Sequence, residues 1–294
     1  MYVNNITSDH LLIKSPAKIN LYLEVLNKRP DGFHNINSAF QAVSLLDELD
    51  FQITDQPGVE LTIANNPELS VGGDNLIVKS YRLMAKRFGL KNGLKVKLTK
   101  NIPVSAGLGG GSGNVAAVIE ACNILFNLNL SQLDKAQVGA IIGSDVPFFF
   151  SGGQALVSGR GEVVEPVELP LDYQLVLVNP KIAVSTPASF AALKRGLTKT
   201  KNPFKLSRCR TVDDLVCSIV TVGNDFEDIH RGTINEIFDI RDGLDEIGAK
   251  VARMSGSGPT VFGIFDRNLS INFSDFSLGR NWLVYTVEPI AFSS

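Results

Sequence analysis

A cluster of glycines directly before a helix-forming run constrains this chain more than any other feature. Five glycines lie between Gly107 and Gly113, and an apolar run from Val115 to Leu125 follows. Glycine adopts positive φ angles and lets the backbone approach a ligand closely. The start of a helix presents unpaired N–H groups and the positive end of the helix dipole. A flexible linker would not need to lead into a helix, so the pattern predicts a loop that binds phosphate groups.

The glycine cluster fits neither of two common phosphate-binding motifs. It is not a Walker A loop, because no Gly-Lys-Ser or Gly-Lys-Thr closes it. It does not match the dinucleotide fingerprint either, because counting from Gly107 puts Ser112 at the position of the third glycine. Ser112 itself can cap the helix, contact a phosphate oxygen or hold Mg²⁺. The sequence leaves these three roles of Ser112 open.

Hydrophobic periodicity predicts strands and helices in both halves of the chain. Gly89 follows a run with helical spacing and is expected to end that helix. Pro16 is expected to divide one N-terminal strand into two. The expected elements are helices at 75–88, 114–126 and 131–142, strands at 93–99, 146–150, 154–158 and 175–180, a mainly helical region at 186–250, and strands at 261–265 and 283–287.

Composition predicts a globular protein and restricts its partners. Hydrophobic residues make up 44% of the chain, charged residues 20%, and the net charge is −2, so no basic surface for nucleic acid is expected. No apolar run is long enough to cross a membrane, and the N-terminus lacks the features of a signal peptide. Three cysteines without metal-ligand spacing indicate reduced thiols and a cytoplasmic protein. A change in composition between residues 161 and 170 predicts two domains, 1–163 and 164–294.

Three shorter segments contain polar residues that are ordinary when taken alone. Lys18 and Asn20 lie two residues apart and therefore share one face of a strand, where a lysine is usually solvated. Asp145 lies in Gly-Ser-Asp-Val-Pro, where an aspartate usually forms a turn or a cap. Residues 254–260 form a second turn rich in glycine and serine that leads into a strand.

Together these segments resemble the GHMP kinases, a superfamily that includes galactokinase, homoserine kinase and mevalonate kinase. The similarity consists of Pro-Ala-Lys-Ile-Asn, Pro-x-x-x-Gly-Leu-Gly-Gly-Gly-Ser, Gly-Ser-Asp-Val-Pro-Phe and Gly-Ser-Gly-Pro-Thr, in this order between Pro16 and Phe265. Segments 28–34 and 74–77 also resemble the members that act on a cytidyl-linked methylerythritol. The resemblance implies an α+β fold of two domains, an N-terminal domain like domain 2 of ribosomal protein S5 and a ferredoxin-like C-terminal domain, with the active site between them.

The resemblance also implies a reaction. The γ-phosphoryl group of ATP would be transferred, with Mg²⁺, to the 2-hydroxyl group of 4-diphosphocytidyl-2-C-methyl-D-erythritol in non-mevalonate isoprenoid biosynthesis. Asp145 would accept the hydroxyl proton with Lys18 as its partner, and a base within hydrogen-bond reach contributes about 10²–10⁴-fold. Ser112 is a possible contact of Mg²⁺. The residues expected to bind ATP are Asn75, Lys100, Pro103, Gly107, Leu108, Gly109, Gly110, Gly111, Ser112 and Gly113.

A second group of residues would bind the acceptor. By resemblance, His34 pairs with the edge of cytosine, Phe33 lies against the base and Phe190 closes on it. Phe33 stands where the family usually has tyrosine, and the ring needed for stacking is kept. Gly113 stands where the family generally has a second serine, so a hydroxyl is lost and the backbone donor stays. The residues expected to bind the acceptor are Asn20, Phe33, His34, Thr186, Pro187 and Phe190.

Three alternatives stay open on the sequence alone. A GHMP kinase for another small alcohol, such as homoserine or mevalonate, would have no base to stack on Phe33 and Phe190. A noncatalytic binding or scaffold protein would not need both Lys18 and Asp145. RNA binding through the N-terminal domain disagrees with the slightly acidic charge balance. The sequence specifies no oligomeric state.

Overall fold

Two long antiparallel strands run through the molecule and organise its fold. The computed structural model describes all residues except 6, 194–208, 272–279 and 293–294. In it, β2 (His10–Lys28) pairs with β3 (His34–Thr54) along most of their length. The break predicted at Pro16 is wrong, because β2 continues through Pro16 with a register shift between Pro16 and Ala17. Such a bulge accommodates a residue without an N–H donor.

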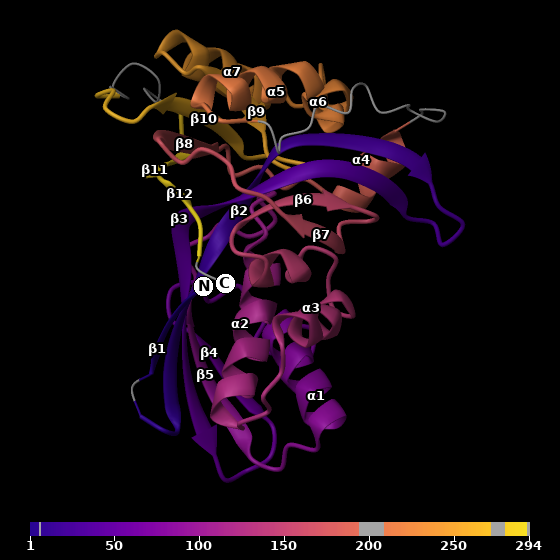
Figure 1. The fold of residues 1–294 in the computed structure, drawn as a ribbon, viewed down its shortest axis with the longest axis vertical. Coiled ribbons are helices and arrows are strands. Elements are labelled where there is room, and N and C mark those ends of the chain that lie inside the picture. Colours follow the sequence, from indigo (N-terminus) through magenta and orange to yellow (C-terminus); the bar gives the residue numbers. More distant parts are fainter. Residues whose placement is uncertain (6, 194–208, 272–279, 293–294) are drawn as a thin grey trace.

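The larger sheet carries three helices on one face. Its other elements and their helices are β1 (Tyr2–Asn5), β4 (Val59–Ile63), β5 (Gly93–Thr99), β6 (Gln154–Ser158), β7 (Val163–Pro166), β12 (Pro289–Ile290), α1 (Leu76–Phe88), α2 (Gly110–Leu125) and α3 (Gln132–Ala140). Within the described residues the sheet has eight strands, five of which follow the order β1-β2-β3-β5-β4. Of the other three, β6 and β12 pair with β3, and β7 pairs with β6. Figure 1 shows α1, α2 and α3 beside these strands.

The smaller sheet is antiparallel and belongs to the C-terminal part. Its elements and the nearby helices are β8 (Tyr173–Asn179), β9 (Val251–Met254), β10 (Val261–Asp266), β11 (Leu283–Val287), α4 (Thr186–Ala192), α5 (Val212–Val222), α6 (Asp225–His230) and α7 (Asn235–Glu246). Within the described residues its four strands follow the order β11-β8-β10-β9. Helices α5, α6 and α7 lie together at the top of the view in Figure 1, and the N-cap of α6 also bridges to Leu23 of β2. The fold is mixed α+β with two domains. The mainly helical character predicted for residues 186–250 is confirmed for the residues that the structure describes there, which exclude 194–208.

Local sequence signals explain where two of the helices begin and end. Asn75 caps α1 by accepting a hydrogen bond from the N–H of Ile77, and Gly89 ends the helix with φ 67°. Ser131 and Asp134 form a capping box at the start of α3. The predicted helices at 75–88 and 131–142 are therefore confirmed within two residues at each end.

Two predicted elements differ in the structure. Helix α2 begins at Gly110 rather than at Asn114, because Gly109 turns the chain into the helix with φ 68°. The segment predicted as a buried strand at 146–150 is a short 3₁₀ helix, η1 (Val146–Phe150). Pro147 lies in its first turn, where a fixed φ favours a helix start and the missing N–H disfavours a sheet.

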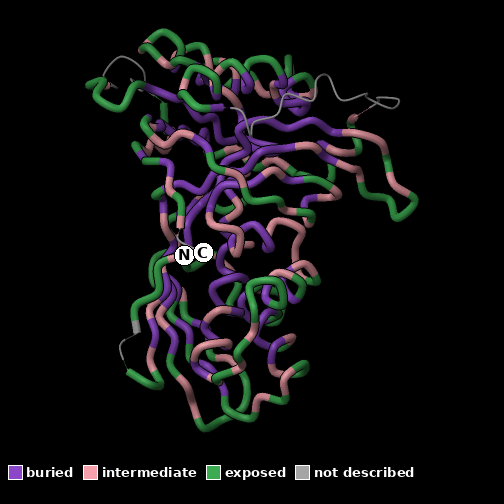
Figure 2. Tube along the Cα trace, viewed as in Figure 1, coloured by how far each residue is buried: buried purple, intermediate pink, exposed green. Residues whose placement is uncertain are grey.

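Helix α2 is enclosed by the protein around most of its circumference. Val115, Val118, Ile119 and Cys122 are all 0% exposed, and Figure 2 shows the buried chain concentrated in the sheets and this helix. A helix that is apolar on all sides is held by close packing, so the position of its N-terminus is fixed. No helix in the described part of the chain combines the length and apolar character needed to cross a bilayer.

Candidate active site

A cavity of about 650 Å³ lies at the N-terminus of α2 and is lined by residues of both domains. This volume is within the range of small-molecule sites. Phe33, His34, Gly113 and Pro187 are not among its lining residues. The other residues that the sequence singled out all line it, namely Lys18, Asn20, Asn75, Lys100, Pro103, Gly107, Leu108, Gly109, Gly110, Gly111, Ser112, Asp145, Thr186 and Phe190.

Residues 103–112 form one side of the cavity, the glycine half. Gly109 packs directly on Lys18, since a Cβ on Gly109 would lie 2.8 Å from Cγ of Lys18. Gly110, Gly111 and Ser112 form the first turn of α2, where N–H groups have no partner within the helix. This half therefore presents main-chain donors and the positive end of a helix dipole to the cavity.

Gly113 does not contribute to the cavity, contrary to expectation. Its N–H donates to the carbonyl of Gly109 at 2.9 Å and is therefore already paired. A Cβ on Gly113 would lie 2.5 Å from Oγ of Ser15 and 3.1 Å from the carbonyl of Pro16. The residue therefore faces β2, and the expected backbone contact of Gly113 with ATP is wrong.

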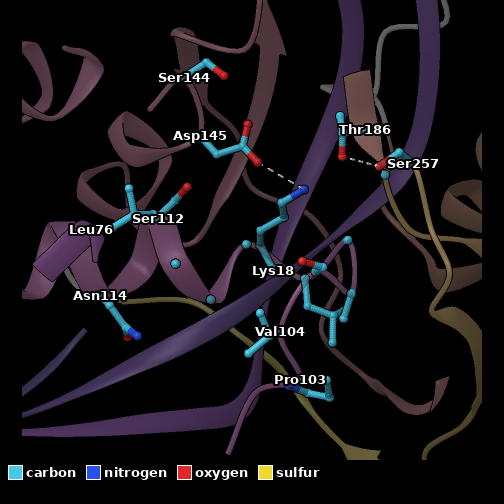
Figure 3. Close-up of a pocket in the computed structure, with 18 of the residues that line it drawn as sticks. Lys18, Leu76, Pro103, Val104, Ser112, Asn114, Ser144, Asp145, Thr186 and Ser257 are labelled. Carbon is cyan, nitrogen blue, oxygen red and sulfur yellow. Dashed lines mark hydrogen bonds and ion pairs between the residues drawn. The ribbon is translucent and has the colours of Figure 1, made fainter. Parts of the chain in front are cut away.

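An ion pair between Lys18 and Asp145 lies inside the cavity (Figure 3). Nζ of Lys18 is 3.3 Å from Oδ2 of Asp145, and it donates to Oδ1 of Asn20 at 2.6 Å. The same ammonium lies 4.3 Å from the ring centroid of Phe40. The lysine side chain is 5% exposed and the aspartate side chain 29%. The ammonium is thus fixed on several sides, whereas the carboxylate opens to the cavity and can accept a proton there.

Ser255 connects the strand that carries Lys18 with the glycine half. Its Oγ accepts from the N–H of Asn20 at 3.1 Å and donates to the carbonyl of Gly107 at 3.0 Å. The amide of Asn20 donates to Oγ of Ser38 at 3.0 Å. A Cβ on Gly107, whose φ is 75°, would lie 2.3 Å from the carbonyl oxygen of Ser255. The turn 254–258 of the C-terminal domain is therefore held against the glycine half.

Lys100 forms a buried ion pair beside the cavity. Its Nζ is 2.8 Å from Oδ2 of Asp47, and the two side chains are 6% and 0% exposed. It also donates to the carbonyl of Ile102, and Oδ1 of Asp47 accepts from the N–H groups of Asn101 and Ile102. Burial lowers the pKa of Lys100 and the charge of Asp47 opposes that effect. The ammonium thus fixes the segment that leads into the glycine half.

Asn75 and Ser112 complete the polar lining near α1 and α2. Asn75 uses its side chain as a helix cap, since Oδ1 accepts from Ile77 N at 2.9 Å and Nδ2 donates to the carbonyl of Ser70 at 2.6 Å. The described residues contain no cluster of three or more His, Cys, Asp or Glu that could hold a metal ion. Mg²⁺ needs few protein oxygens when phosphate and water supply the rest. The hydroxyl of Ser112 lines the cavity, and this oxygen donor fits such an ion.

Phe33, His34 and Phe190 together are named the aromatic half, and of the three only Phe190 lines the cavity itself. The rings of His34 and Phe190 stack with centroids 5.3 Å apart and planes at 17°, and Phe190 meets Phe226 edge-on at 4.9 Å. Phe33 is 52% exposed and lies under the guanidinium of Arg160, at 5.1 Å from its ring centroid. Burial, with a smaller contribution from the charge of Lys28, lowers the pKa of His34. The structure therefore brings His34 and Phe190 together and leaves Phe33 apart from that stack.

Helix α4 joins the aromatic half to the turn 254–258. Oγ1 of Thr186 lies 2.7 Å from Oγ of Ser257 (Figure 3). Ser185 caps the helix by accepting from Ala188 N, and Pro187 lies in the exposed first turn. Thr186 therefore contacts the cavity, whereas Pro187 defines how the helix begins.

Models of known families match both domains. The model described as the GHMP kinases N terminal domain matches residues 75–153, and the model described as GHMP kinases C terminal matches residues 217–274. The chain is 39% identical over 258 residues to a 4-diphosphocytidyl-2-C-methyl-D-erythritol kinase of Caldanaerobacter subterraneus subsp. tengcongensis, covering 87% of this chain and 88% of that protein. It is 37% identical over 283 residues to the protein of the same name from Syntrophus aciditrophicus, covering 95% and 99%. This chain belongs to the GHMP kinases, in the family of 4-diphosphocytidyl-2-C-methyl-D-erythritol kinases.

Solved structures agree with this membership. A crystal structure of a 4-(cytidine 5'-diphospho)-2C-methyl-D-erythritol kinase superposes with a TM-score of 0.73 at 25% identity, over 94% of this chain and 99% of that one. A mevalonate kinase gives the same TM-score of 0.73 at 12% identity, over 96% and 99%, which establishes the fold alone. As a GHMP kinase, the chain uses ATP.

The sequence did not identify a helix that fixes part of this kinase's cavity. Three side chains of α6 and its cap hold the turn 254–258. Asn224 donates to two carbonyls of that turn at 2.7 and 2.9 Å, Glu227 accepts from the N–H of Met254 at 2.8 Å, and His230 donates to a third carbonyl at 3.1 Å. Their spacing of three residues puts them on one helix face. The run Asn-Asp-Phe-Glu gave no local sign of this role, because its burial is apparent only in the structure.

Two charged residues of the kinase were also missed. Asp47 follows an apolar stretch in β3, and a lone aspartate in a strand gives no signal of an ion pair with a lysine more than fifty residues away. Arg160 lies in Ser-Gly-Arg-Gly-Glu between β6 and β7 and lines the cavity. Its glycine neighbours are typical of an ordinary turn.

Proposed function

We propose that this chain transfers the γ-phosphoryl group of ATP to the 2-hydroxyl group of 4-diphosphocytidyl-2-C-methyl-D-erythritol. One arrangement carries the proposal: the N-terminus of α2, the Lys18–Asp145 ion pair and the His34–Phe190 stack adjoin a single cavity. The helix N-terminus suits a phosphate chain. The ion pair suits a reacting alcohol, and the stacked rings suit a nucleotide base.

The glycine half would bind the phosphates of ATP. The N–H groups of Gly110, Gly111 and Ser112 face the cavity region without helical partners. Bound Mg²⁺ would neutralise charge on the transferring oxygens, and the hydroxyl of Ser112 is the oxygen ligand that would hold it, together with phosphate and water. Asn75, Lys100 and the segment from Pro103 to Leu108 would shape the nucleotide site.

Asp145 would act as the general base. Its carboxylate would accept the proton of the 2-hydroxyl as that oxygen forms a bond to the γ-phosphorus and ADP leaves with the electrons of the broken P–O bond. Lys18, 3.3 Å from Asp145, would orient the carboxylate and stabilise charge on the attacking oxygen. Asn20, which binds the same ammonium, would hold the polyol in line.

The aromatic half would bind cytidine. His34 would contact the cytosine edge as a neutral ring, since its pKa is lowered by burial and by Lys28. Phe190 and Phe33 offer ring faces to the base, with Thr186 and Pro187 at the start of α4 beside them. The acceptors homoserine and mevalonate contain no base, which is why these rings favour a cytidyl acceptor.

We propose a domain division between residues 163 and 164, supported by β8 to β11, which pair with one another after that point. Strand β7 reaches Pro166 within the larger sheet and β12 returns to it, so the C-terminal segment contributes to both sheets. The cytoplasmic location stays a prediction.

An acceptor panel tests the proposed function. ADP release is measured with ATP, Mg²⁺ and one of four acceptors: 4-diphosphocytidyl-2-C-methyl-D-erythritol, 2-C-methyl-D-erythritol 4-phosphate, mevalonate or homoserine. We expect kcat/KM for the cytidyl acceptor to exceed the others by at least about 10³-fold, because a site built for hydrogen bonds rejects ligands that lack them. A preference for mevalonate or homoserine would overturn the proposal, and equal use of the acceptor without cytidine would remove the role of the aromatic half.

A further inference from the structure

Among the described cations that line the cavity, Arg160 has the longest ion-pair contact, and its charge also interacts with that of Asp31. Among the described lining residues the other cations are Lys18, 3.3 Å from Asp145, and Lys100, 2.8 Å from Asp47. For Arg160, Nε is 4.0 Å from Oε1 of Glu162, and Nη2 is 3.4 Å from the carbonyl of Ala140. A guanidinium has five N–H donors, so most of its donor capacity is left for a ligand.

The turn that carries Arg160 contacts both ends of the proposed acceptor site. A Cβ on Gly161 would lie 3.3 Å from Oδ1 of Asp145, so the turn packs directly against the proposed base. On its other side, the carbonyl of Gly159 accepts from the N–H of Ile36 at 2.7 Å. Ile36 lies two residues after His34. Arg160 is therefore held between the reacting carboxylate and the residues of the aromatic half.

The guanidinium of Arg160 is held by a ring of that half. It lies 5.1 Å from the ring centroid of Phe33, a geometry that favours a cation over an aromatic face. Its side chain is 33% exposed, so the group is restrained and still accessible to a ligand. A stacked guanidinium keeps its N–H edge free for planar, two-point binding of phosphate oxygens.

We propose that Arg160 binds the diphosphate that joins cytidine to the polyol of the acceptor. This inference rests on the proposed function: when the base lies in the aromatic half and the hydroxyl reaches Asp145, the diphosphate spans the interval that Arg160 occupies. Two negative charges in that interval match a guanidinium whose ion pair is as long as 4.0 Å. The role is one of acceptor recognition and is separate from proton transfer by Asp145.

The phosphates of ATP are the competing ligand for the same guanidinium. Two contacts favour the acceptor, namely the stacking on Phe33 and the hydrogen bond between Gly159 and Ile36. Both connect Arg160 to the aromatic half, whereas the glycine half is formed by residues 103–112. The two sources of phosphate are separated by measuring each substrate independently.

Isothermal titration calorimetry of CDP and of cytidine, which lacks the diphosphate, tests the proposal by measuring the two dissociation constants. We expect Arg160→Gln to weaken CDP binding about 10- to 100-fold, as for hydrogen bonds to charged groups, and to leave cytidine binding unchanged. Arg160→Lys keeps the charge without the planar fork and is expected to fall between the wild type and Arg160→Gln. Arg267→Gln is the matched control, because Arg267 is 52% exposed and pairs with Asp172 outside the cavity.

The outcomes separate this proposal from the proposed function. If the wild type binds CDP and Arg160→Gln binds it equally well, the role of Arg160 is overturned and the function stands. If the wild type binds neither CDP nor the acceptor, the proposed function itself fails. Steady-state kinetics distinguish binding of the acceptor from binding of ATP. In Arg160→Gln, KM for the acceptor is expected to rise while KM for ATP stays unchanged. A rise in KM for ATP instead would assign Arg160 to the nucleotide. Thermal unfolding of each variant checks that it is folded.

Discussion

The glycine half and the aromatic half of the cavity are built by different means. In the glycine half, the main chain forms the surface, with positive φ at Gly107 and Gly109 and a helix start behind them. In the aromatic half, side chains form the surface: Phe190 lines the cavity, His34 stacks on it, and Phe33 is 52% exposed on the hairpin between β2 and β3. Main-chain donors recognise phosphate in any nucleotide, whereas ring faces and edges distinguish one acceptor from another.

The difference predicts how each half responds to substitution. A side chain added to the glycine half must displace neighbours, as at Gly107, and so disturbs the position of the loop itself. A ring removed from the aromatic half leaves the backbone in place and weakens one ligand. Asp145 lies between the glycine half and the aromatic half and would act where their two ligands meet. Its substitution is therefore expected to reduce activity most.

The largest effect is expected for Asp145→Asn. This change nearly preserves shape but removes the group that accepts the proton, so kcat should fall by at least about 100-fold. KM for ATP should stay near the wild-type value. Asp50→Asn is a matched control, because Asp50 pairs with His10 on the surface at 42% exposure. Near-normal turnover by Asp145→Asn would remove this residue from the role of base.

Gly107→Ala is expected to have the next largest effect. Its φ of 75° disfavours alanine, and the added Cβ would lie 2.3 Å from the carbonyl oxygen of Ser255. Since a displacement of about 1 Å can cost about 10²-fold, we expect a loss of about 10- to 100-fold in kcat/KM for ATP. Steady-state kinetics at saturating acceptor measure it.

Gly89→Ala is the control for that substitution. Gly89 has a similar φ of 67°, but a Cβ on this residue would have no atom within 4 Å, and Gly89 ends α1 away from the cavity. Backbone strain of this kind costs about 1 kcal/mol of folding stability and should leave kcat unchanged. Equal losses of activity in both variants would mean that strain, and not contact with Ser255, explains the Gly107 result.

Phe190→Ala is expected to raise KM for the acceptor by about tenfold, through lost stacking and apolar contact. KM for ATP should be unaffected, because Phe190 packs on His34 and Phe226. Phe190→Tyr keeps the ring and should behave nearly as the wild type. An equal rise in both KM values for Phe190→Ala would contradict the separation of the two halves.

The smallest expected effect is a dependence on pH. The pKa of His34 lies below its ordinary value because of burial and the nearby charge of Lys28, so the ring is neutral at pH 7 and above. The neutral ring can accept a hydrogen bond from cytosine, and the imidazolium cannot. KM for the acceptor should therefore be flat above pH 7 and rise about threefold as the pH falls toward 5. In His34→Gln, which does not titrate, this rise should disappear.

Sequence patterns predicted the glycine half better than the aromatic half. The glycines of residues 107–111 and the helix behind them follow from local rules, and the shared face of Lys18 and Asn20 follows from strand periodicity. The start of α2 was misplaced because Gly109, at φ 68°, already turns the chain into the helix, and the glycines that follow have low helix propensity. The buried partner of Lys100, the stack of His34 on Phe190 and the position of Arg160 depend on contacts between distant segments, which no local pattern specifies.

The central claim is that one cavity brings a nucleotide phosphate and a cytidyl-linked hydroxyl to Asp145. The most direct test is phosphorus NMR of the products after incubation of the purified protein with ATP, Mg²⁺ and 4-diphosphocytidyl-2-C-methyl-D-erythritol. We expect a new phosphomonoester signal on the acceptor, equimolar with ADP, and an unchanged acceptor diphosphate. Formation of ADP with inorganic phosphate and no phosphorylated acceptor would contradict the claim.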